Sequence, residues 1–271
     1  MHDFPATNLI SSNRSTGWTN WIPAVHRISG VMTLFLFVVM PLSACSTAVS
    51  ARQSAPPVLK SPPPPVLKTT PFKPEFTSNA TQISSKLAQE ITGVTWKRGC
   101  PVPIRDLRYL TLSVWGMNGQ PYQGELIVHS HVVHNIISVF RRMFTARFPI
   151  AKMKLIHNYN GSDDASVADN NTSAFNCRDV VGGKGWSKHA YGLAIDINPF
   201  WNPYVTRKRL IPPKATQYVK RTPIRPGMIK AGDVVHRNFL KRGWEWGGIW
   251  RSVKDYQHFQ YSPKKLPRKG R

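Results

Sequence analysis

Apolar and polar residues alternate along the chain in patterns that predict both strands and helices. Residues 107–115 (LRYLTLSVW) alternate as a half-buried strand does. The Asn-Gly pair at 118–119 predicts a turn, in a loop longer than a two-residue hairpin. Glu125 to Val128 then starts a return strand. From His131 to Phe148 the apolar residues recur at helical spacing, which predicts an amphipathic helix packed on a sheet.

Shorter patterns follow this helix. Met153 to Ile156 is compatible with another short strand, and Leu193 to Ile197 (LAIDI) predicts an apolar strand with one acid set into it. Between them, Asn158 to Gly185 is rich in Gly, Ser, Asp and Asn and is expected to be a long, functional loop. We expect packed structure to begin near Ile83. The fold class predicted is α+β, a single compact domain with a small antiparallel sheet flanked by helices.

The charge balance predicts attraction to polyanions. The chain has 37 Lys and Arg against 13 Asp and Glu, a formal net charge of +24. Residues 205–271 alone hold 18 basic residues and 3 acidic ones. Nucleic acid, anionic lipid headgroups and acidic cell-envelope polymers all fit such a surface, and charge does not choose among them.

The first segment is typical of an export signal. Residues 31–42 (VMTLFLFVVMPL) are apolar but shorter than the roughly 20 residues of a membrane span. They follow a long, weakly basic stretch, as in a secretory signal peptide. The ending Leu42-Ser43-Ala44-Cys45 resembles a bacterial lipobox, in which the cysteine is lipidated. We therefore predict a lipoprotein signal peptide over 1–44, lipidation at Cys45 and anchoring in the bacterial cell envelope. A plain signal peptide is the alternative. Export also makes nucleic acid hard to reach, so we expect no nucleic-acid partner.

A Pro-rich segment separates this leader from the folded part. Residues 45–76 contain the repeat PPVLK twice, at 56–60 and 64–68. Such composition favours extended polyproline II and acts as a semi-rigid spacer. We assign 45–76 to a linker, 77–262 to the folded domain and 263–271 to a basic tail.

The chain has three cysteines, Cys45, Cys100 and Cys177, and their number is consistent with export. An odd count in an exported protein leaves one thiol to explain. If Cys45 carries lipid, Cys100 and Cys177 remain and can pair in an oxidising compartment. Two buried free thiols are the alternative, and we favour the disulfide.

Two segments carry the residue types of a zinc site. In the first, residues 186–196 (WSKHAYGLAID), Gly192 permits a sharp turn that folds His189 back beside Asp196. One imidazole and one carboxylate suit Zn²⁺, and a catalytic zinc site usually adds a third protein ligand and keeps a position for water. The second segment, 244–259, supplies His258 as the third ligand.

An acid near His258 completes a catalytic set. Asp255 precedes His258 by three positions, so both can share one face of a helical turn or tight loop. A carboxylate there can take a proton from water and pass it to a leaving amine. Glu245, between two tryptophans, is the rival base and is better explained as an exposed position on a strand. Asp163, Asp164 and Asp169 can face a substrate amine or solvent.

The motif SxHxxGxAxD followed by DxxH resembles the zinc D-Ala-D-Ala carboxypeptidase and L-alanyl-D-glutamate endopeptidase family, in its branch with an Asp base. The resemblance spans roughly residues 95–262. It implies that His189, Asp196 and His258 bind zinc and that Asp255 is the catalytic carboxylate. It also implies an upstream Arg that stabilises the oxyanion or holds a substrate carboxylate. Arg178 matches that Arg best, with a loop salt bridge as the alternative.

Two further positions enter through this resemblance. Ser187 matches the Ser of the motif and is expected to support the metal ligands. Gln260 departs from the pattern, because many members carry Glu after the His-Phe pair. The activity implied is hydrolysis of peptide bonds in peptidoglycan stem peptides, at a terminal D-Ala-D-Ala link or an internal one such as L-Ala-D-Glu.

Other interpretations are weaker. His129, His131 and His134 form a second histidine cluster, but no acid or Cys accompanies them, so surface or packing roles are favoured. Five tryptophans lie around the two motifs and either line a groove or build the core: Trp186, Trp201, Trp244, Trp246 and Trp250. A structural zinc site would normally have four protein ligands, usually rich in Cys. The rival from another class is a non-catalytic, basic, envelope-binding lipoprotein, which would tolerate loss of Asp255.

Overall fold

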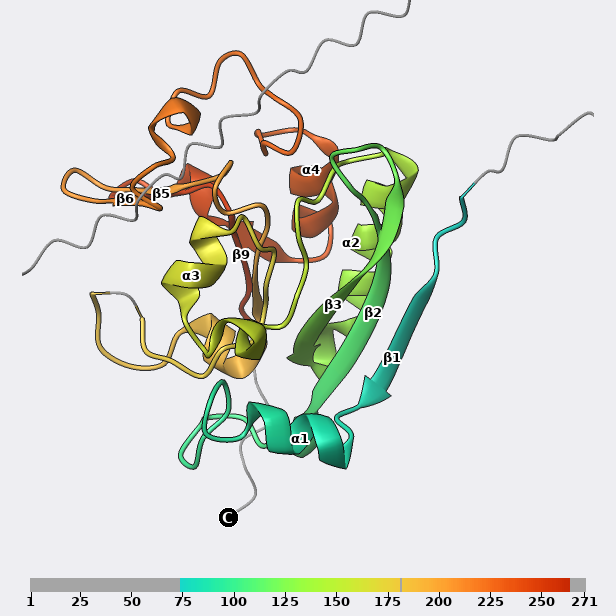
Figure 1. The fold of residues 1–271 in the computed structure, drawn as a ribbon. Coiled ribbons are helices and arrows are strands. Elements are labelled where there is room, and N and C mark those ends of the chain that lie inside the picture. Colours follow the sequence, from blue (N-terminus) through green and yellow to red (C-terminus); the bar gives the residue numbers. More distant parts are fainter. Residues whose placement is uncertain (1–73, 181, 264–271) are drawn as a thin grey trace, which may run out of the picture. The chain divides into compact units, whose positions relative to one another are not determined.

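The computed structural model describes residues 74–180 and 182–263 (Figure 1). The proposed signal peptide 1–44, the lipidation site Cys45, the linker up to residue 73 and the tail from residue 264 lie outside the described residues. The predictions made for them stay predictions.

The first sheet is antiparallel and holds three strands in the order β1-β2-β3. Its strands are β1 (Ser78–Gln82), β2 (Leu107–Trp115) and β3 (Pro121–His129). The predicted strand over 107–115 is confirmed, and the return strand is longer than Glu125 to Val128. The expectation that packing begins near Ile83 is wrong, because β1 precedes it. This edge strand is polar and mostly exposed, so it carries no apolar pattern to recognise.

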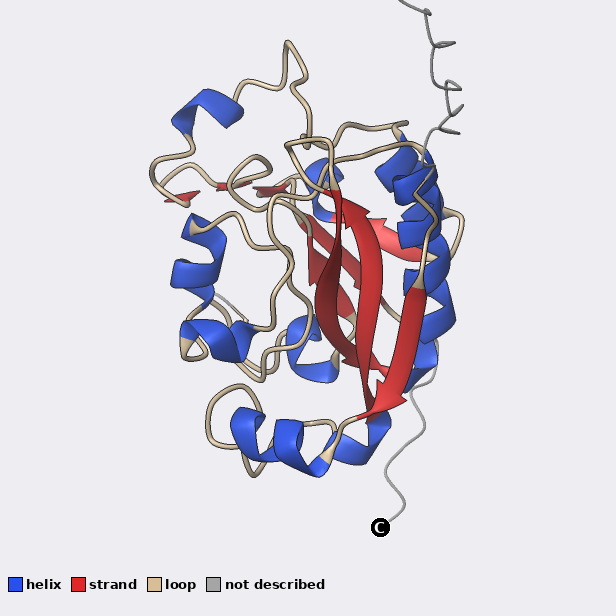
Figure 2. Cartoon of the chain, turned by 45° about the vertical axis from the view of Figure 1, so that its right-hand side comes forward, coloured by secondary structure: helices blue, strands red, loops and turns tan. Residues whose placement is uncertain are grey.

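The predicted amphipathic helix is confirmed as α2 (Val133–Thr145), which packs on the first sheet (Figure 2). It is shorter than predicted, because a single 3₁₀ turn precedes it at 130–132. Ile136 and Phe140 of α2 are fully buried with Leu110 and Leu112 of β2 in the larger core. The periodicity of this helix therefore reports a real buried face.

The second sheet carries Asp196 and His258 and contributes residues to the same core. It has the order β4-β9-β7, with β4 (Ala194–Asp196), β7 (Trp244–Trp246) and β9 (His258–Tyr261). Helix α4 (Val234–Leu240) packs on β7 and on α2. Phe239 of α4 stacks on Phe259 of β9 with ring centroids 4.2 Å apart. These aromatic contacts fix β9 in place.

A third sheet is smaller still and joins β5 (Tyr204–Val205), β6 (Leu210–Ile211) and β8 (Lys254–Asp255) in the order β6-β5-β8. The α+β class is confirmed, although the antiparallel pairing is divided among three sheets. The described residues also form 3₁₀ turns at Ile104–Asp106, Ser130–Val132, Ile156–Tyr159, Lys188–Tyr191, Thr216–Tyr218 and Gly247–Ile249.

Two sequence predictions fail between α2 and β4. Met153 to Ile156 is not a strand, because the Asn171 side chain bonds both the N–H and the carbonyl of Lys154, at 2.8 and 3.0 Å. Those are the groups that would form hydrogen bonds with a neighbouring strand.

The expected loop from Asn158 to Gly185 contains a short helix, α3 (Asp163–Ala168). Its N-cap is Ser162, which accepts a hydrogen bond from the Ala165 N–H.

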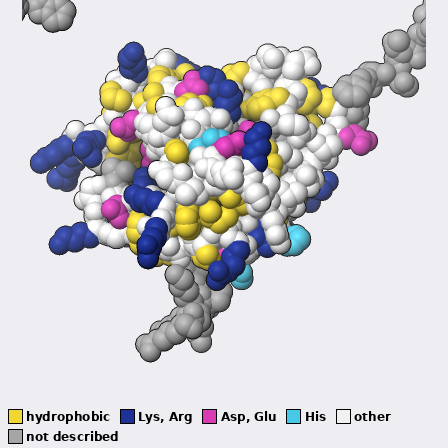
Figure 3. Space-filling model, turned by 60° about the horizontal axis from the view of Figure 1, so that its bottom comes forward, with side chains coloured by type: hydrophobic (Ala, Val, Ile, Leu, Met, Phe, Trp, Pro, Cys, Tyr) yellow, Lys and Arg dark blue, Asp and Glu magenta, His cyan; other side chains and the backbone are white. Residues whose placement is uncertain are grey.

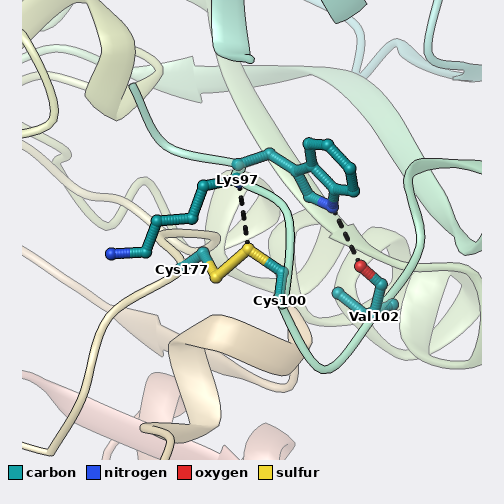
Figure 4. Close-up of a disulfide and its surroundings, with 5 residues drawn as sticks. Lys97, Cys100, Val102 and Cys177 are labelled. Atoms are coloured by element: carbon teal, nitrogen blue, oxygen red, sulfur yellow. Dashed lines mark hydrogen bonds between the residues drawn. A yellow bond between two sulfur atoms is a disulfide. The ribbon is translucent and has the colours of Figure 1, made fainter. Parts of the chain in front are cut away.

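A smaller hydrophobic core lies beside α1 (Ser85–Ile91) and contains the predicted disulfide. Cys100 and Cys177 are bonded, with their Cα atoms 6.0 Å apart. Figure 4 shows the bridge, with the Lys97 backbone N–H directed at the Cys100 sulfur. Residues 77 positions apart are thus joined, which ties the loop that carries Arg178 to the α1 segment.

The surface retains the charge imbalance seen in the sequence. Between Asp196 and Asp233 the chain has eight Lys and Arg and no acid. On the face drawn in Figure 3, Lys and Arg side chains project around smaller hydrophobic patches. None of the helices within the described ranges combines the length and apolarity needed to cross a membrane.

Candidate metal centre and active site

His189 lies in the 3₁₀ turn Lys188–Tyr191, which glycine and serine define at its two ends. Ser187 caps the turn by accepting the His189 N–H at 3.3 Å. Gly192 ends it with a φ of +65°. A Cβ at Gly192 would lie 2.6 Å from the His129 backbone nitrogen, so the position requires glycine. The predicted turn between His189 and Asp196 is confirmed.

Asp196 and His258 meet through strand register. They are directly opposite each other in the antiparallel β4–β9 pair. Both residues are buried, each with 8% of its surface exposed. Opposite residues of an antiparallel pair place their side chains on one face of the sheet. Residues 62 positions apart therefore share one small site.

Side-chain atoms of three residues converge at this point. The His189 Nε2 atom is 3.2 Å from Asp196 Oδ2 and 3.3 Å from His258 Nδ1. His258 Nδ1 is 2.9 Å from Asp196 Oδ1. In a tetrahedral zinc site with metal–ligand distances of about 2.0 Å, neighbouring ligand atoms lie about 3.3 Å apart. The donor set and its spacing fit zinc. Within 74–180 and 182–263 it is the only group of three or more His, Cys, Asp or Glu residues whose ligand atoms all lie within 4.8 Å of one another.

The outer nitrogen of each imidazole is bonded to the protein. His189 Nδ1 donates to the Ala174 carbonyl, and His258 Nε2 donates to Gln260 Oε1 at 3.2 Å. These bonds leave His189 Nε2 and His258 Nδ1 directed at the convergence point. Metal-bound histidines are oriented by bonds of this kind.

The charges of the site are strongly coupled. Burial alone would raise the pKa of Asp196, but the charges and hydrogen bonds of His189 and His258 hold it far below its usual range. Burial alone would lower the pKa of His258, but Asp196, with help from Asp255, raises it to about 9. A carboxylate and an imidazolium thus hold the metal-free site together. Without such partners, a buried charge would be unfavourable.

Asp255 ends β8, and two residues separate it from His258, where β9 begins. Its backbone pairs with Tyr204 of β5, so of the two forms predicted, a helical turn or a tight loop, the helical turn is not observed. Burial raises the pKa of Asp255 to about 6, with His258 opposing and Asp196 adding to the shift. The Oδ1 atom is buried and has no hydrogen-bond partner among the described residues. An acceptor kept free in this way is suited to take a proton.

Arg178 is held close to this centre. Its guanidinium forms an ion pair with Asp163 of α3, and Asp163 Oδ1 also accepts from Asn176 Nδ2 at 2.8 Å. Burial lowers the pKa of Arg178, whereas the charges of Asp196 and Asp255 oppose that shift. The salt bridge offered as an alternative is therefore present, and the charges of Asp196 and Asp255 also act on the guanidinium.

The other candidates lie elsewhere or have different partners. Glu245 is exposed on β7, as predicted for a strand position. Asp169 pairs with Lys152 and Tyr159, and Asp164 is exposed. The second histidine cluster forms a local cap, in which His129 Nδ1 accepts the His131 N–H.

The tryptophans divide between core and site. Trp244 and Trp246 are buried in the larger core. Trp250 lies beside the centre, with its ring centroid 5.5 Å from that of His258. The adjacent Ile249 is 60% exposed and leaves an apolar side chain at the surface.

Three contacts at the site were not anticipated from the sequence: the Ala174 carbonyl, Asp163 as partner of Arg178, and Gln260 as partner of His258. Each depends on long-range register or loop packing. The departure from the family pattern at Gln260 was the one available signal for the third.

Residues 181–261 match the family described as D-alanyl-D-alanine carboxypeptidase. The matched span contains His189, Asp196, Asp255 and His258 and begins just after Arg178. The match supports a relationship to this peptidase family and a peptidase activity related to peptidoglycan. No curated protein and no solved structure gives a significant match to the chain.

Proposed function

We propose that this chain is an exported, lipid-anchored zinc peptidase that hydrolyses peptide bonds in peptidoglycan stem peptides. The observation that carries the proposal is the convergence of His189 Nε2, Asp196 and His258 Nδ1, with a buried carboxylate oxygen of Asp255 close by. The family match over 181–261 supports the same activity.

The residues that would hold zinc are His189, Asp196 and His258. Zinc in such a site polarises a carbonyl and lowers the pKa of water. Asp196 offers one carboxylate to the site, and its hydrogen-bonded histidines keep it ionised. Three protein ligands leave room for water or substrate, as in catalytic rather than structural zinc sites.

Asp255 is assigned the proton transfer. Its unpaired Oδ1 accepts the proton of the attacking water and delivers it to the leaving amine. The charges of Asp196 and Asp255 act on the pKa of Arg178. Arg178 stabilises negative charge on the substrate carboxylate or on the tetrahedral intermediate. The Asp163 ion pair keeps its guanidinium oriented for this.

The scissile bond is a terminal D-Ala-D-Ala link or an internal link such as L-Ala-D-Glu. Cys45 would carry the lipid, and the Pro-rich linker would hold the domain away from the membrane. The alternative of a non-catalytic envelope-binding lipoprotein does not account for Asp255, because a binding module gains nothing from a buried, unpaired carboxylate.

Digestion of purified peptidoglycan by the full chain tests the proposal. Mass spectrometry of the soluble products identifies the bond, with free D-Ala indicating a carboxypeptidase and stem peptides an endopeptidase. We expect release to require zinc and to stop when a chelator removes it. Zinc-loaded protein that sediments with the wall but releases no product would instead support the binding module.

A further inference from the structure

A chain of hydrogen bonds leads away from the metal centre through β9 to β7. His258 Nε2 donates to Gln260 Oε1 at 3.2 Å, and Gln260 Nε2 donates to Glu245 Oε2 at 3.0 Å. His258 and Gln260 are two positions apart on β9, so they share one face of the strand. Gln260 is directly opposite Glu245 in the β7–β9 register. The sheet therefore fixes all three side chains relative to one another.

The chemistry of the last residue determines the orientation of the others. A glutamine amide can present either its oxygen or its NH₂ group to a neighbour, whereas an ionised carboxylate only accepts hydrogen bonds. Glu245 therefore attracts the NH₂ group of Gln260 and turns the amide oxygen towards His258. An acceptor at that point requires hydrogen on His258 Nε2, which leaves Nδ1 free for the metal centre.

We propose that Gln260 and Glu245 are positioning residues that select Nδ1 of His258 as its metal-binding nitrogen. The inference rests on the proposed function, because it takes the His189-Asp196-His258 group to be a metal site. Many proteins of the family that the sequence resembles carry Glu at the position of Gln260. Here the carboxylate stands one hydrogen bond further out, on the neighbouring strand.

Four variants and one control variant of the full chain test this relay of hydrogen bonds from Glu245 through Gln260 to His258, with zinc affinity measured by competition against a chelator of known affinity. Gln260→Ala removes the partner of His258, and we expect zinc to bind about 10- to 100-fold more weakly. Glu245→Gln lets the amide at 260 rotate, so we expect a smaller, about two- to fivefold loss, since Glu245 is exposed. Gln120→Ala, an exposed glutamine of the β2–β3 turn, is the matched control and should not change the affinity.

Exchanging the residues at 245 and 260 tests the relay most directly. Gln260→Glu alone keeps an acceptor for His258 but places two carboxylates opposite each other, so we expect zinc to bind more tightly than it binds to Gln260→Ala. Gln260→Glu combined with Glu245→Gln keeps that acceptor and returns a hydrogen-bond donor to the carboxylate at 260, so affinity should approach that of the native chain. In parallel, ¹⁵N NMR of the ring nitrogens in the zinc-loaded chain should show His258 with hydrogen on Nε2.

Distinct results overturn the relay and the proposed function. If the native chain binds zinc tightly and folded Gln260→Ala binds it equally well, the relay is wrong and the proposed function stands. The relay is also wrong if the exchange variant binds zinc no better than Gln260→Ala, or if zinc occupies His258 Nε2. If the native chain binds no zinc, both are wrong.

Discussion

At the scale of single residues, the centre depends on which atom of each side chain faces inward. The sequence motif identifies His189, Asp196 and His258, because their residue types and the Gly192 turn point to zinc. It does not identify the nitrogen that each histidine uses. That choice comes from the Ala174 carbonyl and from Gln260, which only the folded chain brings to the two rings.

His258 predicts the pH dependence of zinc binding. Burial would lower its pKa, but Asp196 and Asp255 raise it to about 9, so the ring is protonated below that pH in the metal-free chain. A metal needs the Nδ1 lone pair and must displace this proton. We expect zinc to release one proton near neutral pH, and its apparent affinity to fall about tenfold per pH unit as the pH drops from about 9 to about 7. Calorimetry in buffers of different ionisation enthalpy counts the protons, and a count of zero would refute this assignment.

The ion pair between Asp163 and Arg178 predicts a loss of activity that does not depend on zinc affinity. Asp163→Asn removes the charge that orients Arg178. We expect kcat/KM to fall about tenfold or more, because small displacements of a positioned group are costly, while zinc affinity stays the same. The exposed neighbour Asp164→Asn is the control, and steady-state kinetics on a peptidoglycan stem peptide is the measurement. Equal activity of the two variants would show that Arg178 does not need its partner.

At the scale of elements, short strands and a tight turn bring the distant ligands together. Asp196 and His258 meet because β4 and β9 pair at that register, and β7 and α4 support β9 from behind. The strand over 107–115 and the helix within 131–148 were predictable, since each buries one face and shows a clear period. β1 was not, because four of its five residues are exposed.

The failed predictions have equally local causes. The segment at 153–156 is apolar enough for a strand, but the side chain of Asn171 takes the backbone groups that a second strand would bond. Helix α3 has only six residues, too few for periodicity to reveal it, although its cap and two acids in the first turn were a usable signal. Side-chain competition for backbone groups is a tertiary effect that periodicity does not report.

Gly192 predicts the consequence of disturbing the tight turn. Gly192→Ala meets both a positive φ and a backbone clash with His129, so we expect about 1–3 kcal/mol of lost stability and weaker zinc binding. Gly119→Ala is the control, because Gly119 has a φ of +72° and nothing within 4 Å of the added Cβ. Chemical denaturation and zinc competition of both variants provide the comparison. Equal losses in the two variants would mean that the clash is relieved without cost.

At the scale of the whole described domain, two hydrophobic cores lie on opposite faces of the first sheet, because Val128 of β3 belongs to the larger core and its neighbour Ile127 to the smaller one. The larger one contains α2, α4 and the inner face of β9, and the smaller one surrounds the disulfide. Cys177 immediately precedes Arg178, so the disulfide in the smaller core also holds the chain next to this arginine.

This arrangement predicts that the disulfide contributes to both stability and activity. Replacing Cys100 and Cys177 with Ala opens a link across 77 positions, so we expect the free energy of unfolding to fall by about 2–4 kcal/mol. Urea denaturation followed by tryptophan fluorescence measures it, with the native chain under reducing conditions as a second comparison. Reductant should shift the native chain and leave the variant unchanged. An unaltered midpoint in the variant would contradict the assigned role.

The most direct test of the zinc peptidase account is Asp255→Asn, measured for zinc content and for peptidoglycan turnover in the same preparation. The account predicts that zinc affinity stays within a few-fold of the native chain while kcat falls by about 10²- to 10⁴-fold, because only the proton-transfer group is lost. A variant that keeps native turnover with zinc bound would show that Asp255 is not the base and would contradict the mechanism.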